Sequence, residues 1–127
     1  MSNCTTQGIR VAARPFYLPD ESQPEIENFL FGYEITISNE SEQVAMILDR
    51  HWIIKDARNR IEEVEGEGVV GQTPTLEPGE SFTYQSYCPL KTAYGFMRGS
   101  YGMLREDGER FEAEIAPFVL LPHWMLN

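Results

Sequence analysis

Apolar and polar residues alternate with a period of two along most of this chain, which is the pattern of β-strands that bury one face. The clearest stretch is residues 29–37, where aromatic and branched side chains share one face and small or polar residues hold the other. Residues 82–86 and 111–115 alternate in the same way, and polar turns at residues 39–42 and 106–109 separate the stretches. The pattern therefore predicts strands that are joined by short turns.

The second apolar stretch is interrupted. Val44, Met46 and Leu48 fall on one face, the alternation breaks around residues 49–51, and it resumes at Trp52. One strand that contains a β-bulge, or two strands that meet at a corner, would produce this break.

Further strands are expected at residues 8–17, 61–64 and 94–104, and an apolar run follows at residues 118–121. The glycines within residues 94–104 indicate a close approach of neighbouring backbones. These stretches bring the total to seven or eight strands, with a single helical turn near residues 25–28 and no amphipathic helix. An antiparallel all-β sandwich or barrel is the expected fold class.

The segment Gly66-Glu67-Gly68-Val69-Val70-Gly71 has the glycine spacing of a dinucleotide-binding loop. Such a site needs a helix that opens at the last glycine, so that the pyrophosphate lies at the helix N-terminus. Pro74 and Pro78 follow instead, and each would remove a backbone donor from a helix. No lysine follows the last glycine, which excludes a P-loop. The segment is therefore predicted to be a loop between strands.

Composition narrows the class of protein. The 127 residues suit one domain, and 20 acidic against 10 basic residues give a formal charge of −10. This balance excludes a general nucleic-acid surface, which needs clustered positive charge. Two cysteines are too few for a disulfide framework, and no apolar run reaches the roughly 20 residues of a membrane span. Without a signal pattern, the cytoplasm is the expected location.

Several ordered blocks of residues resemble the ApaG family, and together they cover the chain from about residue 11 to residue 120. The blocks are Tyr33-x-Ile35-x-Ile37-x-Asn39, Leu48-x-Arg50-x-Trp52-x-Ile54-x-Asp56, Val64-x-Gly66-x-Gly68-Val69-Val70-Gly71, Pro74-x-Leu76-x-Pro78-Gly79-Glu80-x-Phe82-x-Tyr84 and Gly95-x-Met97-x-Gly99-x-Tyr101-x-Met103. The combination is specific, whereas the glycine block alone would be a weak signal.

The resemblance implies a fibronectin type III-like or immunoglobulin-like antiparallel β-sandwich of about seven strands. It implies one domain over residues 1–127, of which we expect residues 1–7 to be disordered. It also implies a link to cobalt and magnesium homeostasis, because bacterial members act as accessories to cation efflux. Related domains in eukaryotic proteins resemble protein-binding modules. The family offers no established catalytic residues, so a non-enzymatic protein without a cofactor is expected.

The glycine segment is a candidate site for a phosphate compound such as pyrophosphate or a nucleotide. Gly66, Gly68 and Gly71 allow the backbone angles of an anion-binding nest, and Arg58 and Arg60 are nearby cations in the sequence. Four glutamates just before and within the segment oppose an anion there, so a structural bulge is the alternative interpretation.

The same glutamates are a candidate site for a divalent cation, with Glu65 and Glu67 as its ligands. Mg²⁺ and Ca²⁺ prefer oxygen ligands, and carboxylates close together in sequence supply them. A solvated acidic rim is the alternative interpretation.

Asp49 and His51 fall on one face of their strand, where a carboxylate can orient an imidazole. Nucleophilic catalysis would also need Ser86 or Cys88 beside that histidine, and nothing in the sequence places either of them there. A structural role is therefore expected for this segment.

Trp52, Tyr33 and Phe82 are expected in the core between the sheets. At the other end of the chain, the apolar residues 118–126 either close the sandwich as a last strand or leave Trp124 and Met125 as a patch that binds a partner. The sequence as a whole favours a module that binds another protein, as a monomer or a homodimer, without a nucleic-acid or membrane partner. A divalent cation or a phosphate-containing small molecule is the alternative ligand.

Overall fold

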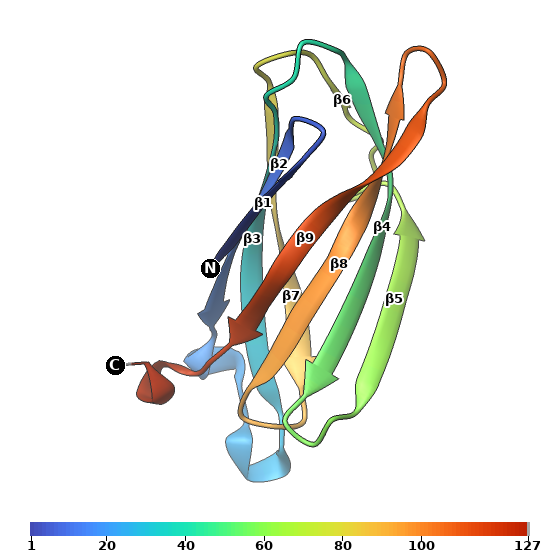
Figure 1. Cartoon of the computed structure of the whole chain (residues 1–127). Coiled ribbons are helices and arrows are strands. Elements are labelled where there is room, and N and C mark those ends of the chain that lie inside the picture. Colours follow the sequence, from blue (N-terminus) through green and yellow to red (C-terminus); the bar gives the residue numbers. More distant parts are fainter. Residues whose placement is uncertain (127) are drawn as a thin grey trace.

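Two antiparallel β-sheets pack face to face in the computed structural model of the chain, which describes residues 1–126 (Figure 1). The strands are β1 (Ser2–Thr6), β2 (Ile9–Tyr17), β3 (Phe29–Asn39), β4 (Ala45–Asp56), β5 (Ile61–Glu67), β6 (Thr75–Leu76), β7 (Ser81–Leu90), β8 (Gly95–Arg105) and β9 (Arg110–Leu120). Three single 3₁₀ turns complete the chain at Pro19–Glu21, Pro24–Ile26 and His123–Met125. The expected antiparallel β-sandwich of the immunoglobulin-like class is confirmed.

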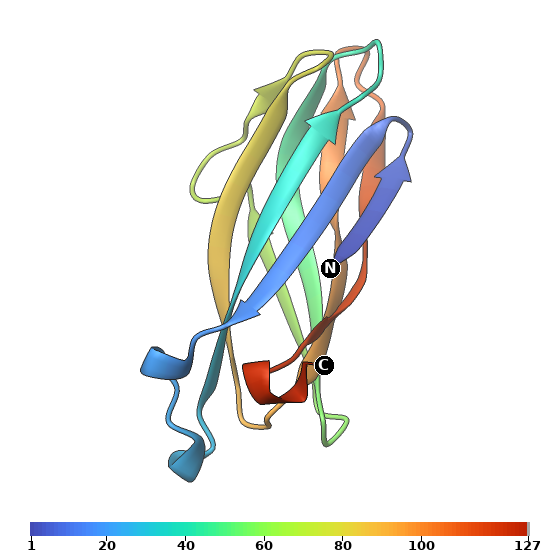
Figure 2. The same ribbon diagram turned by 90° about the vertical axis from the view of Figure 1, so that its left-hand side faces the viewer.

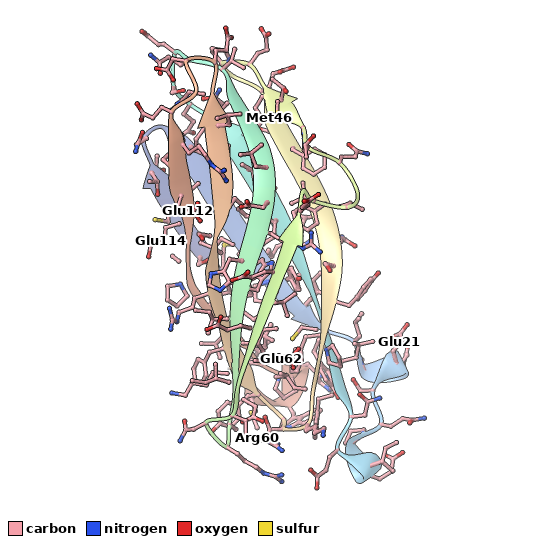
Figure 3. All side chains as sticks on the ribbon, turned by 90° about the vertical axis from the view of Figure 1, so that its right-hand side faces the viewer. Glu21, Met46, Arg60, Glu62, Glu112 and Glu114 are labelled. Atoms are coloured by element: carbon pink, nitrogen blue, oxygen red, sulfur yellow. The ribbon has the colours of Figure 1, made fainter. Side chains whose placement is uncertain are left out.

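One sheet has the order β1-β2-β3-β7, and the other has the order β5-β4-β8-β9, with the short β6 also paired to β4. Figure 2 looks onto the first sheet. The two sheets meet along β1 and β9, where the Glu114 amide donates a 3.1 Å hydrogen bond to the Thr6 hydroxyl. On the opposite side, which Figure 3 faces, β5 and β7 are the two edge strands. The sandwich is therefore closed along one side and bordered by free strand edges along the other.

The N-terminal residues differ from the expectation of disorder for residues 1–7. Ser2–Thr6 form β1, which pairs with β2 across a turn at Gln7 and Gly8, both at positive φ. Two successive positive φ angles are those of a type I′ hairpin turn, which matches the twist of the strands. Backbone pairing, rather than an apolar face, holds this strand, so its composition gave no signal.

Inward-facing side chains of both sheets form one core, which includes Phe31, Ile35 and Ile37 of β3 at 0% exposure. β4 contributes Ala45 and Ile47, both fully buried, and then Trp52. Ile47 and Trp52 face the same side of the sheet, although one position is odd and the other even. The reason is a bulge between Ile47 and Asp49, which shifts the register with β8 by one residue.

As a result, the side chains on the face that the alternation predicts to be apolar are only half-buried. These are Val44, Met46 and Leu48. The predicted bulge is therefore present, and it lies at Leu48 rather than at residues 49–51. The core uses the other face of the stretch, where a small and a branched residue fit between the sheets.

Two strands are longer than their patterns predict. β5 continues past Val64 and includes Gly66, and β7 continues to Leu90, beyond the predicted stretch of residues 82–86. Gly99 on β8 confirms the predicted close approach, because a Cβ at this position would lie 2.0 Å from the His51 carbonyl oxygen. No helix in residues 1–126 has the length and apolar character needed to cross a bilayer.

Candidate functional site

The glycine segment is built around Arg50. Gly66 lies directly opposite Arg50 in the β4–β5 ladder, and a Cβ on Gly66 would lie 2.7 Å from the guanidinium carbon. Nη1 of Arg50 donates two 3.0 Å hydrogen bonds, one to the carbonyl of Glu67 and one to the carbonyl of Gly68. The first glycine therefore makes room for an arginine that caps the end of β5.

The rest of the segment is a tight turn held by its own backbone. The amide of Gly68 donates to the Leu48 carbonyl at the bulge, and the amides and carbonyls of Val69 and Gln72 exchange hydrogen bonds. Positive φ angles occur at Gly68, Val70 and Gly71. Three of the amides that an anion nest would use are thus directed at protein carbonyls, and β6 follows the turn where a dinucleotide site would need a helix.

Arg58 and Arg60 lie in the turn that precedes β5, whereas the glycine segment begins at the opposite end of this strand. β5 has seven residues and so separates the two ends by about 20 Å. Figure 3 shows Arg60 at the lower end of the strand. The structure therefore does not bring these two arginines to Gly66, Gly68 and Gly71.

Asp56 organises the turn that carries the two arginines. Its Oδ1 accepts the amides of Arg58 and Arg60 at 2.8 and 3.0 Å, and its Oδ2 accepts Nε of Arg60 at 2.7 Å. Burial alone would raise the pKa of Asp56, but these hydrogen bonds outweigh it and hold the pKa below its usual value. The carboxylate is therefore part of the turn and is not free to bind a ligand.

Asp56→Asn is expected to lower the thermal unfolding midpoint at pH 7, and the deficit should shrink at pH 3. The pKa in the folded state lies below the usual value of about 3.9, so the ionised group stabilises the fold fully above that pH and progressively less below it. Thermal unfolding followed by circular dichroism at both pH values measures the difference. The exposed Asp20→Asn is the control, and a deficit of equal size at both pH values would contradict the prediction.

His51 lies on the outer face of the five-stranded sheet, because its neighbour Trp52 points between the sheets. Its Nε2 is 3.4 Å from Oε2 of Glu63 and 3.7 Å from Oε1 of Glu65. Glu67 pairs instead with Asp49 in the β4–β5 register. The structure thus places Glu65 with a histidine and Glu63, a grouping that the candidate pair Glu65 and Glu67 did not include.

The arrangement that nucleophilic catalysis needs is not formed around His51 in residues 1–126. Cys88 is 3% exposed between the sheets, on the other side of β4 from the imidazole, and Ser86 shares its face of β7. Burial, aided by the charge of Glu62, raises the pKa of the Cys88 thiol to about 12. The thiol is therefore protonated at neutral pH and is a poor nucleophile.

A groove of about 750 Å³ opens between the edge strands β5 and β7. Its lining includes Tyr33, Trp52 and Met97 from the core, and its rim includes Ile61 and Tyr87 of the two edge strands. Ile61 is 64% exposed and Tyr87 is 59% exposed. Sequence analysis did not single out either residue, although a large apolar side chain on an otherwise polar strand face is a usable signal.

The floor of the groove also carries polar groups. Burial raises the pKa of the Tyr33 phenol, which has the Ser86 hydroxyl as its neighbour, so the phenol keeps its proton at neutral pH. Arg50 lines the same groove. Arg60 lines it as well, so a ligand in the groove would meet an aromatic surface with hydroxyl groups and two guanidinium groups.

The three residues expected in the core differ in burial. Trp52 is 3% exposed and Tyr33 is 6% exposed, and their rings lie 5.2 Å apart. Phe82 is only partly buried and packs against the core from β7.

The C-terminal tail closes the sandwich with its first residues and leaves its last residues partly exposed. Its first residues complete β9, whereas Trp124 and Met125 lie in the last 3₁₀ turn at 50% and 38% exposure. The ring of Trp124 contacts the edge of Tyr17 with 5.4 Å between the centroids. The turn is thereby fixed to β2, with part of the indole left in solvent.

The architecture defines an immunoglobulin-like β-sandwich with a groove between its free strand edges. The family model of the ApaG domain matches residues 19–105. The chain is 50% identical over 127 residues to Protein ApaG of Anaeromyxobacter dehalogenans, covering 100% of both chains. It is 49% identical over 120 residues to Protein ApaG of Dechloromonas aromatica, covering 94% of each. The chain therefore belongs to the ApaG family.

Solved structures agree with this assignment. A crystal structure described as the ApaA protein of Bordetella pertussis superposes with a TM-score of 0.90 at 42% identity, over 94% of this chain and 98% of that chain. The resemblance stated from the sequence blocks is thus confirmed.

Proposed function

We propose that the protein is a non-enzymatic binding module that holds an extended segment of another protein in the groove between β5 and β7. The observation that carries the proposal is the groove itself, which combines an aromatic floor with two free strand edges. A peptide that adds a strand to such an edge gains backbone hydrogen bonds, and alternate side chains enter the groove.

The edge strands β5 and β7 differ in charge, and this difference indicates which of them the partner segment pairs with. None of the ten residues of β7 is charged, whereas β5 carries four glutamates in seven residues. Charged side chains on an edge strand discourage pairing, so β7 is the edge that accepts the segment. Pro89 has no amide hydrogen, so pairing is limited to the part of β7 that precedes it.

The glutamates of β5 select the chemistry of the segment. Glu62 lines the groove and is seen on β5 in Figure 3. A segment that lies along β7 has Glu62 opposite it, so a basic side chain is favoured at that point and apolar side chains are favoured toward Trp52. The expected partner is therefore an extended segment in which apolar residues alternate with lysine or arginine.

Membership of the ApaG family supplies the physiological setting of this proposal. The resemblance links the family to cobalt and magnesium homeostasis, in a role accessory to cation efflux. Within the proposal, the partner is a protein of that system, and the groove is the surface that contacts it.

Selection of a displayed random peptide library against the purified protein tests the groove. We expect enrichment of sequences that alternate apolar and basic residues, and amide shifts in β5 and β7 when such a peptide is added to isotope-labelled protein. Ile61→Lys should weaken binding at least about tenfold, through loss of apolar contact and added repulsion. Phe96→Lys is the matched control, because Phe96 is also exposed, at 39%, but does not line the groove.

Three outcomes would overturn the proposal. One is the absence of any enriched peptide. Another is a set of amide shifts around Trp124 with none at β7. The third is a homodimer in sedimentation experiments in which a second copy of this chain protects the β7 amides from exchange.

A further inference from the structure

We propose that His51, Glu63 and Glu65 form a binding site for a divalent first-row transition-metal ion on the outer face of the five-stranded sheet. One ligand atom from each residue lies within 4.8 Å of the other two. His51 and Glu65 are direct cross-strand partners, and Glu63 is the next residue on the same face of β5. Backbone pairing between β4 and β5 thus fixes the spacing of the three side chains.

The distances suit a metal ion. Bonds of 2.0–2.2 Å to nitrogen and oxygen in a tetrahedral site place neighbouring ligand atoms about 3.3–3.5 Å apart. Nε2 of His51 lies 3.4 Å from Oε2 of Glu63 and 3.7 Å from Oε1 of Glu65. Rotation of two exposed glutamate side chains is enough to close the set, and no backbone movement is needed.

The donor set selects the class of ion. One imidazole nitrogen and two carboxylate oxygens suit zinc, nickel, cobalt or manganese, whereas Mg²⁺ and Ca²⁺ prefer oxygen ligands alone. The side chains are 33%, 61% and 75% exposed for His51, Glu63 and Glu65, so water has access to the remaining coordination positions.

The surroundings leave the carboxylates available. Within residues 1–126, no lysine or arginine nitrogen lies within 4.0 Å of a carboxylate oxygen of Glu63 or Glu65. Asp49, the other acidic residue of β4 on this face, is engaged by the amide of Gly102 and by Arg110. The two glutamates therefore have His51 as their only ion-pair partner within 4.0 Å in the described part of the chain, and a dication would neutralise both.

The site is distinct from the groove in the proposed function. Its side chains lie on the outer face of β4 and β5, whereas the groove lies between the sheets. Metal binding and peptide binding can thus fail independently, and each has its own variants.

Isothermal titration with Zn²⁺, repeated with Ni²⁺, tests the site in the full chain. We expect one ion per chain. His51→Ala and the double variant E63Q/E65Q should each weaken binding by at least the roughly 10–100-fold that loss of an outer-shell partner costs. Glu62→Gln is the matched control, because it removes the same charge from the same strand but on the other face, and its affinity should match the wild type.

A second readout locates the ion. Substoichiometric Mn²⁺ should broaden the amide signals of residues 51, 63 and 65 before those of other strands. The proposal is overturned if Zn²⁺ produces no heat, if His51→Ala binds as tightly as Glu62→Gln does, or if broadening is spread over the acidic surface.

Discussion

Trp52→Ala is expected to lower the free energy of unfolding by about 3–5 kcal/mol, the range for removing a buried tryptophan. Trp52 is 3% exposed and packs against three aromatic rings, those of Tyr33, Tyr101 and Phe118, at centroid distances of 5.2, 6.4 and 6.0 Å. An alanine would leave a cavity where the two sheets meet and would remove part of the groove floor. Urea unfolding followed by far-UV circular dichroism measures the loss.

Trp124→Ala is the control for this experiment, because the same truncation is made at a side chain that is 50% exposed. Its cost should stay below about 1 kcal/mol, as for most surface substitutions. Since total stabilities of about 5–15 kcal/mol are typical, Trp52→Phe is the second variant to measure, and it should show a smaller loss in the same direction. An unchanged urea midpoint for Trp52→Ala would contradict the assignment of this residue to the core.

The strand pattern was predictable where each strand keeps one register. In β3 the alternation from Phe29 to Ile37 gives the buried face directly, because no bulge interrupts it. In β4 the same reasoning selects Val44, Met46 and Leu48, whereas the structure buries Ala45 and Ile47. Periodicity locates a bulge but does not say which side of it faces the core.

The short strand β1 was not predicted, and the reason is different. β1 depends on its hairpin pairing with β2 and on its contact with β9, and the second of these joins residues that are 108 positions apart. Its residues alternate between half-buried and exposed without a hydrophobic pattern. A sequence-based prediction reads local composition and therefore cannot detect a strand that is stabilised in this way.

The candidate site was predictable only in part. Strand alternation alone places Glu63, Glu65 and Glu67 on one face of β5. The partner of that face follows from the β4–β5 register, which pairs His51 with Glu65 across the turn at residues 57–60. The length of β5 beyond Val64 was not apparent from its pattern, so the register was not known in advance and could not bring the histidine and Glu63 together.

The glycine segment shows the same limit. The two prolines that follow it are enough to predict a loop instead of a nucleotide-binding helix. Gly66 leaves space for the guanidinium of Arg50. This contact cannot be predicted without the pairing of β4 with β5. The structural role expected for the segment of Arg50 takes a specific form, because its guanidinium caps the carbonyls of Glu67 and Gly68.

Gly68→Ala is expected to lower the free energy of unfolding by about 2–4 kcal/mol, which is large for the addition of one methyl group. Gly68 has a φ of +63°, and a Cβ there would lie 2.2 Å from the carbonyl oxygen of Gln72. That oxygen accepts the amide of Val69 and closes the turn, so the backbone has to shift and the hydrogen bond is weakened. Urea unfolding measures the loss.

Gly71→Ala separates the effect of the contact from the effect of the backbone angle. Gly71 has a φ of +74°, and a Cβ at this position would have no atom within 4 Å, so only the cost of the left-handed conformation applies, about 1–2 kcal/mol. A larger loss at Gly68 than at Gly71 would mean that the glycine spacing is set by the close packing of the turn against its own Gln72 carbonyl. Equal losses, together with calorimetric binding of pyrophosphate that both variants abolish, would contradict this and would return the segment to the class of phosphate-binding loops.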